Sequence, residues 1–82
     1  MTEPYTLKLS VPGHRSTIYR ALYQQIRDQI LDGYLAPGAR LPSSRALAAE
    51  LGCSRGSVER AFELLLAEGF IQGQGAAGTR VN

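Results

Sequence analysis

Apolar residues recur at helical spacing in three segments of the chain, and glycine or proline residues separate these segments. The first helix is expected to begin near Thr17 or Ile18 and to end at Asp32, with Gly33 as its stop signal. An apolar stripe about 100° wide is typical of a helix that packs on a core. Here the stripe consists of Tyr19, Leu22, Tyr23, Ile26 and Ile30. The two tyrosines could also stack on bases, but we interpret them as core residues of a scaffold helix.

The run from Leu41 to Phe70 predicts two short helices separated by Gly52-Cys53-Ser54. Ser43 is the expected N-cap of the first of these helices, because a serine hydroxyl accepts a hydrogen bond from an N–H group of the first turn. Ser44 and Arg45, in that turn, are expected to face outward. The apolar side of this helix is expected to be formed by Ala46, Leu47, Ala49 and Leu51.

The helix that follows is expected to be capped by Ser54, to run from Arg55 to about Glu68 and to end at Gly69. Its buried stripe is predicted to be Val58, Ala61, Phe62 and Leu65. The residues projected opposite that stripe are Gly56, Arg60, Glu63 and Ala67. Two helices joined by a short glycine turn form a helix-turn-helix, whose second helix enters the major groove of DNA.

Short strands are expected on both sides of this pair of helices. Leu35 and Leu41 are expected to enter the core, with Arg40-Leu41 long enough for a minimal strand after the Pro37-Gly38 turn. Residues 70–72 and 79–81 are expected to pair as a hairpin with residues 73–78 as its tip. The pattern therefore predicts a mainly α fold with a small β-hairpin, a winged helix-turn-helix of three helices plus a wing.

Residues 1–16 show no sustained helical period and are interpreted as an N-terminal arm. Tyr5, Leu7 and Leu9 alternate with polar residues, a pattern that suits a short strand or an arm packed on the domain. The division that follows is an arm over residues 1–16 and one DNA-binding domain over residues 17–82. A chain of 82 residues has room for one small core.

Eight of the nine basic residues are arginine, and Lys8 is the exception. Arginine suits bidentate contacts with phosphate and guanine, although codon bias explains such a composition equally well. The net charge is +2. The segment from Arg40 to Arg60 holds four arginines against two glutamates, so its local surface is basic.

Other classes of function find little support in the sequence. Cys53 is the single cysteine and His14 the single histidine, so neither a disulfide within the chain nor a cysteine-rich metal site is possible. We interpret Cys53 as a small buried apolar residue and see no pair of nucleophile and base, so no enzymatic activity is expected. No apolar run approaches the roughly twenty residues that cross a bilayer, and the N-terminus lacks the pattern of a secretion signal. A cytoplasmic location is expected.

Three segments resemble the N-terminal DNA-binding domain of the GntR family of bacterial transcription regulators: LYQQIRDQILDGYLAPGARLPSSRALAAELG, SRGSVERAFELLLAEGF and GTRV. The resemblance covers residues 18–81. The SSRALAAELG and GTRV segments are most similar to the MocR-type subgroup, whose members continue into a large domain resembling a pyridoxal-phosphate-dependent aminotransferase. The resemblance implies that residues 55–68 enter the major groove of operator DNA and that the wing, residues 70–81, lies near the minor groove.

The resemblance also implies phosphate and base contacts from the residues matching Arg45, Ser54, Arg55, Gly56 and Ser57, and from the wing tip. The helical projection adds Arg60. The full set of expected DNA-binding residues is Ser44, Arg45, Ser54, Arg55, Gly56, Ser57, Arg60, Gly75, Ala76 and Arg80.

Two features depart from the family pattern. Glu59 stands where many members carry a basic residue, and it would repel a phosphate if it faced the DNA backbone. The tip Gly75-Ala76-Ala77-Gly78 has no hydrogen-bonding side chain, so backbone amides and Arg80 would have to make the wing contacts.

The chain stops where the last strand of the wing ends, which suggests a domain excised from a longer regulator. We expect no cofactor in this chain, and pyridoxal phosphate, if present, would bind beyond Asn82. A homodimer is expected in the full-length protein, while the lone domain should bind one half-site with a steep salt dependence. The alternative is a winged helix that binds protein or RNA. Its sign would be an exposed apolar patch, for which Leu64 and Leu66 are the candidates.

Overall fold

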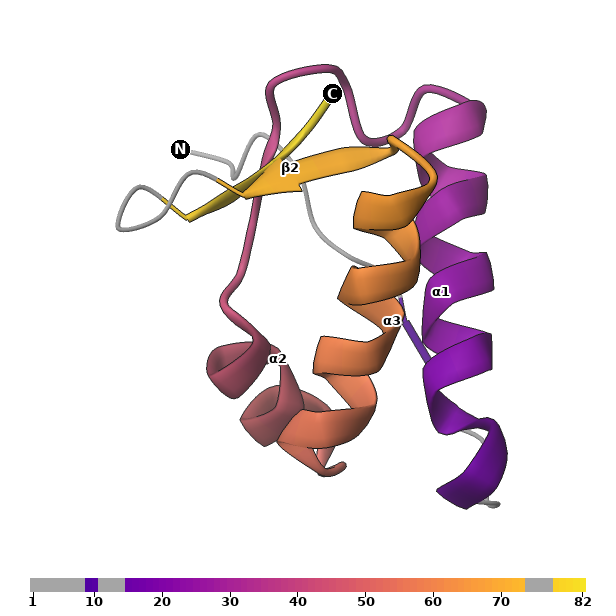
Figure 1. The fold of residues 1–82 in the computed structure, drawn as a ribbon, viewed down its shortest axis with the longest axis vertical. Helices are drawn as coiled ribbons and strands as arrows, with labels where there is room; N and C mark the ends of the chain where they lie inside the picture. The colour runs from indigo at the N-terminus through magenta and orange to yellow at the C-terminus, as the bar shows by residue number, and fades with distance from the viewer. Residues whose placement is uncertain (1–8, 11–14, 74–77) are drawn as a thin grey trace.

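The computed structural model describes residues 9–10, 15–73 and 78–82. Three helices, α1 (Arg15–Leu31), α2 (Ser44–Leu51) and α3 (Arg55–Ala67), are combined with three short strands, β1 (Arg40–Leu41), β2 (Ile71–Gly73) and β3 (Thr79–Val81). Helices α1 and α3 lie side by side, α2 lies beside the N-terminal half of α3, and the sheet lies where α3 ends (Figure 1). The predicted winged helix-turn-helix is confirmed.

Helix α1 begins at Arg15, two or three residues earlier than its apolar pattern indicated. The first N–H groups of a helix have no partner within the helix, so its first turn can form from polar residues that continue no apolar stripe. At the other end, Gly33 adopts a φ of 86° that suits glycine, and its N–H donates to the Ile30 carbonyl at 3.2 Å. Gly33 therefore ends α1, as predicted.

The turn between α2 and α3 is built from local hydrogen bonds. The Ser43 hydroxyl accepts from the Ala46 N–H at 3.0 Å and caps α2. Gly52, with a φ of 71°, ends α2 by donating from its N–H to the Ala48 carbonyl at 2.9 Å. The Ser54 hydroxyl accepts from the Ser57 N–H at 3.2 Å and caps α3. Both serine caps were predicted, and Gly52 was expected in the turn, because these features depend on residues close in sequence.

The core is one cluster to which every helix and strand contributes. Its buried apolar residues are Ile18, Leu22, Ile26, Leu35, Leu41, Leu47, Ala48, Val58, Ala61, Phe62, Leu65, Ile71 and Val81. The predicted buried stripe of α3 is confirmed, and so is the burial of Leu35 and Leu41. Tyr23, Ile30 and Cys53 pack against the cluster while remaining half-buried.

The predicted apolar side of α2 is wrong in part. Leu47 and Ala48 are buried and Leu51 is half-buried, whereas Ala46 and Ala49 are exposed. The buried residues share one face of a helix that turns by 100° per residue, and the two exposed alanines lie on the opposite face. Alanine is small enough to occupy either face, so its position in the sequence did not reveal how α2 is oriented.

The three strands form one antiparallel sheet in the order β1-β3-β2. Strands β2 and β3 form the predicted hairpin, with Ile71 opposite Val81 and Gln72 opposite Arg80. Strand β1, expected only as a minimal strand, pairs with β3 and places Arg40 opposite Arg80. The expected wing-tip contacts at Gly75 and Ala76 lie outside the described residues.

Two residues of the expected N-terminal arm are described before α1. Leu9 packs against the core. The backbone of Ser10 exchanges two hydrogen bonds with the side-chain amide of Gln25 in α1, each 2.9 Å long. This segment of the arm therefore lies against α1, and the other residues of the expected Tyr5-Leu7-Leu9 alternation lie outside the described part of the chain.

Candidate nucleic-acid interface

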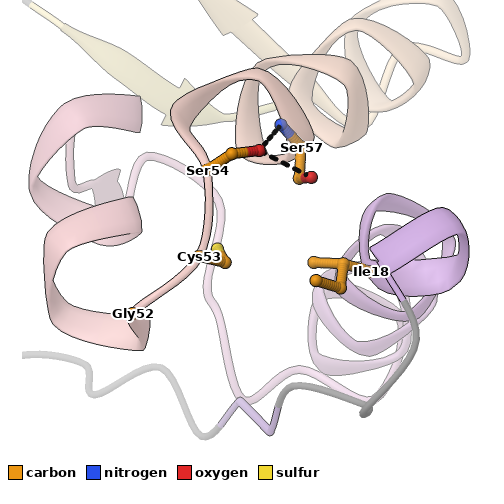
Figure 2. A pocket seen from close by; sticks show the side chains of 5 residues that line it. All are labelled: Ile18, Gly52, Cys53, Ser54 and Ser57. Carbon is orange, nitrogen blue, oxygen red and sulfur yellow. Dashed lines mark hydrogen bonds between the residues drawn. The ribbon is translucent and has the colours of Figure 1, made fainter.

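The N-terminal turn of α3 brings four of the expected DNA-binding residues together: Ser54, Arg55, Gly56 and Ser57. The Ser54 and Ser57 hydroxyls lie 3.0 Å apart, and the Ser54 hydroxyl also accepts from the Ser57 N–H (Figure 2). The Ser54 hydroxyl is thus engaged in capping, and the Ser57 hydroxyl is hydrogen-bonded to it. The aligned peptide groups give this end of the helix a partial positive charge, which favours an anion such as a phosphate.

Gly56 leaves the surface of this turn open. A Cβ atom built on Gly56 would meet no atom within 4 Å, and its φ lies outside the positive range that glycine alone adopts easily. The fold therefore does not require glycine here. A missing side chain on an exposed helix end allows another molecule to approach the backbone closely.

Arg55 is paired within α3. Its Nε donates to the Glu59 carboxylate at 3.1 Å, one helical turn further on, and the two side chains are 55% and 48% exposed. The expected repulsion between Glu59 and a DNA phosphate is thus offset by the positive charge of Arg55 within the domain. The pair is exposed and can open, because surface ion pairs contribute little free energy.

Arg60 is exposed, as its position opposite the buried stripe predicted, but its guanidinium is turned toward α1. The Arg60 Cζ lies 4.4 Å from the centre of the Tyr19 ring. A hydrogen-bonding interaction with Arg20 and the positive charge of Arg60 hold the pKa of Tyr19 below its ordinary value. The predicted core role of Tyr19 is wrong, because Tyr19 is half-buried and is not part of the core cluster. Its contact with an arginine of α3 was not predicted.

The remaining expected residues lie on α2 and the sheet. Arg45 is exposed on the first turn of α2 and has no hydrogen bond or ion pair within the described part of the chain, while Ser44 beside it is half-buried. Arg80 is half-buried, and its Nη1 donates to the Gly38 carbonyl at 2.9 Å. Arg40 stands opposite it on β1, so the sheet carries a pair of facing arginines.

A cavity of 340 Å³ lies beside the turn that joins α2 to α3. It is lined by Ile18, Gly52, Cys53, Ser54 and Ser57. Cys53 and Ile18 point toward one another across it, with the Ser57 hydroxyl at its side (Figure 2). Within residues 9–10, 15–73 and 78–82, no three metal-ligating side chains gather and no helix is long and apolar enough to cross a membrane.

The alternative of a protein- or RNA-binding module predicted an apolar patch at Leu64 and Leu66. Leu64 is half-buried and Leu66 is 44% exposed. Two further large apolar side chains, Leu31 and Tyr34, are exposed at and just after the end of α1. Single exposed apolar residues are common on protein surfaces and indicate no interface by themselves.

Comparison with known proteins shows the family of this chain. Residues 18–81 match the family described as bacterial regulatory proteins, gntR family. The pyridoxine biosynthesis transcriptional regulator PdxR of Corynebacterium glutamicum is 42% identical over 71 residues, which cover 87% of this chain and 16% of PdxR. The probable rhizopine catabolism regulatory protein MocR of Rhizobium meliloti is 41% identical over 64 residues, which cover 78% of this chain and 13% of MocR. This chain thus spans less than a fifth of the length of these two relatives.

Solved structures agree with this assignment. The structure of YtrA from Sulfolobus acidocaldarius, a GntR-family transcription factor, superposes with a TM-score of 0.79 at 36% identity, covering 93% of this chain and 79% of YtrA. The family match spans α1 from Ile18 onward, the helix-turn-helix and the sheet. The chain belongs to the gntR family of bacterial regulatory proteins, as the winged helix-turn-helix DNA-binding domain of a transcription regulator.

Proposed function

We propose that this domain binds double-stranded operator DNA in a sequence-specific manner, with α3 in the major groove and residues 70–81 near the minor groove. The observation that carries the proposal is the first turn of α3. Here the exposed Arg55 stands beside a glycine whose missing side chain leaves the positive end of the helix open. A phosphate or base edge can approach such a surface without displacing any part of the fold.

The surrounding arginines extend this surface onto other elements. Arg45 projects from α2 without an internal partner among the described residues and is suited to a phosphate that flanks the groove. Arg60 lies one helical turn beyond Gly56 and is suited to a phosphate or a guanine. The Ser54 hydroxyl caps α3 and the Ser57 hydroxyl is hydrogen-bonded to it, and a phosphate can share both hydroxyl groups.

The wing completes the proposed interface. Arg80 is fixed to the Gly38 carbonyl, which places its positive charge on the sheet beside Arg40. The tip residues Gly75 and Ala76 offer backbone N–H groups, which suits close approach to the sugar-phosphate backbone at the minor groove.

Effector binding and dimerisation are part of the same proposal. MocR and PdxR are several times longer than this chain, so effector binding and stable dimerisation would reside outside residues 1–82. The domain alone would then occupy one half-site, and its affinity would fall steeply with salt. The proposed role is binding rather than catalysis, and access to the chromosome implies a cytoplasmic location.

The test is a proton–nitrogen NMR titration of the 82-residue chain. One probe is a duplex selected from a random-sequence pool on the immobilised chain, and the control is a scrambled duplex of the same composition. We expect shifts at Arg45, residues 54–60 and the wing, larger for the selected duplex. A chain that shows no shift with either duplex at low salt would contradict the proposal. Binding to a single-stranded RNA or a protein instead would favour the interaction-module alternative.

A further inference from the structure

The two exposed arginines of α3 are held in different ways. The Arg55 Nε–H donates to the Glu59 carboxylate, so Arg55 is paired with a negative charge. Arg60 rests over the Tyr19 ring and forms no ion pair with a carboxylate within the described residues. The two contacts differ in what they leave available for a ligand.

An ion pair occupies in-plane N–H donors, whereas stacking on an aromatic ring occupies only the face of the guanidinium. The donors of a stacked arginine remain available in the plane for bidentate bonds to a phosphate or to guanine. Arg60 can therefore bind an acceptor without first losing its contact within the protein, while Arg55 has its Nε donor already engaged by Glu59.

Tyr19 is well placed for this task because its own position is fixed. It lies on α1 next to Ile18, which is buried in the core, and α1 packs along α3. Arg20 forms a hydrogen-bonding interaction with the Tyr19 hydroxyl and adds a second positive charge beside it, and Arg60 has a weaker interaction of the same kind with this hydroxyl. The ring limits the conformations of a long side chain that would otherwise lose rotamer freedom on binding.

We propose that Tyr19 is a positioning residue for DNA recognition, whose ring holds the Arg60 guanidinium ready to donate to an acceptor oxygen of the duplex. The inference rests on the proposed function and extends it from α3 to α1. It assigns the aromatic ring, rather than the hydroxyl, as the group that acts.

A double-mutant cycle in the 82-residue chain tests this proposal. The variants are Tyr19→Leu, Tyr19→Phe, Arg60→Gln and the double variant Tyr19→Leu/Arg60→Gln, with duplex affinity measured by fluorescence anisotropy. Arg60→Gln should lose roughly five-fold or more in affinity. Tyr19→Leu should lose about two- to five-fold, the usual strength of an exposed cation–π contact, and Tyr19→Phe should keep the parent affinity. The double variant should bind as Arg60→Gln does.

Independent losses that multiply in the double variant would overturn the proposal, as would Tyr19→Phe binding as poorly as Tyr19→Leu. Equal losses on the selected and scrambled duplexes would assign the acceptor to a phosphate, and a loss confined to the selected duplex would assign it to a base. Thermal unfolding and NMR spectra check that each variant is folded. The Arg60 side-chain protons should also move to lower field in Tyr19→Leu without DNA, as the ring current is lost.

The outcomes separate the two levels of inference. A parent chain that binds no duplex contradicts the proposed function and this inference together. A parent chain that binds normally, with no coupling between Tyr19 and Arg60, contradicts this inference alone.

Discussion

Glu59 holds Arg55 at 3.1 Å across one turn of α3, so a potential DNA contact is neutralised within the free domain. The pair spans the i and i+4 positions, at which opposite charges stabilise a helix by about 0.2–0.5 kcal/mol. This free energy is small beside that of a good base or phosphate contact, about 1–3 kcal/mol. DNA can therefore compete with Glu59 for Arg55.

Glu59→Gln should increase the affinity for DNA several-fold. The change frees Arg55 and removes a negative charge from the proposed interface, while the free energy of unfolding should change by less than about 0.5 kcal/mol. Fluorescence anisotropy with the selected duplex measures the affinity. Glu63→Gln, which removes another exposed glutamate of α3, is the matched control. An equal gain in affinity for Glu63→Gln would assign the effect of Glu59→Gln to net charge alone.

Arg55→Ala should weaken binding to the selected duplex by about 1–3 kcal/mol, as measured by the same anisotropy experiment.

Gly56→Ala should separate binding from folding. The added methyl group meets open space and replaces glycine in a helix, so the free energy of unfolding should rise by up to about 1 kcal/mol. Affinity for the duplex should fall, because the methyl group would stand between the helix end and an approaching phosphate. Thermal unfolding and anisotropy give the two values. Unchanged affinity would place the DNA elsewhere on the domain.

Gly52→Ala should have the opposite effect on stability. The space around Gly52 is equally open, but its φ of 71° is costly for alanine. We expect the free energy of unfolding to fall by about 1 kcal/mol, as measured by urea titration. A stability equal to that of the parent would mean that the turn between α2 and α3 can adopt a different backbone conformation.

Arg80 and Arg40 should contribute differently to the free energy of unfolding, although they face each other in the sheet. Arg80→Ala removes a hydrogen bond to the Gly38 carbonyl and should lower the free energy of unfolding by about 0.5–1.5 kcal/mol. Arg40→Ala removes one of two facing positive charges and should leave stability unchanged or slightly higher. Urea unfolding of both variants at low and high salt tests this difference. Equal losses in both variants would exclude a special role for the Gly38 contact.

Tyr23 should make stability fall at high pH. The hydrogen bond that Tyr23 donates to Glu68, with desolvation and the negative charge of Glu68, raises the pKa of Tyr23 above its ordinary value. The folded chain then holds this proton more tightly than the unfolded chain. The contribution to stability is therefore complete below about pH 10, the usual tyrosine pKa, and is lost as pH rises through the raised pKa.

Tyr23→Phe should remove this part of the pH dependence, as measured by unfolding at several pH values. Tyr19 is the natural comparison, because its lowered pKa acts with the opposite sign. Its contribution to stability is complete above the unfolded pKa and is lost as pH falls through the lowered pKa of the folded chain. A parent and a Tyr23→Phe variant with parallel pH profiles would contradict the assignment to Tyr23.

The sequence by itself determined the features that depend on neighbouring residues. Ser43 and Ser54 cap helices through N–H groups three positions away, and the stripe from Val58 to Leu65 follows from helical geometry. The hairpin between residues 70–72 and 79–81 followed from turn chemistry, with a shift of one residue in β2. The set of DNA-binding residues came mainly from the family resemblance and stays a prediction.

The tertiary structure alone decided the contacts between segments far apart in the chain. The pairing of Arg40 with Arg80 and the stacking of Arg60 on Tyr19 have no signature in local spacing. The orientation of α2 was equally hidden, because alanine tolerates both burial and exposure. Local patterns fix helices, caps and turns because their partners are a few residues away. Such patterns carry no information on which arginine stacks on which aromatic ring, since that depends on how the helices and strands pack against one another.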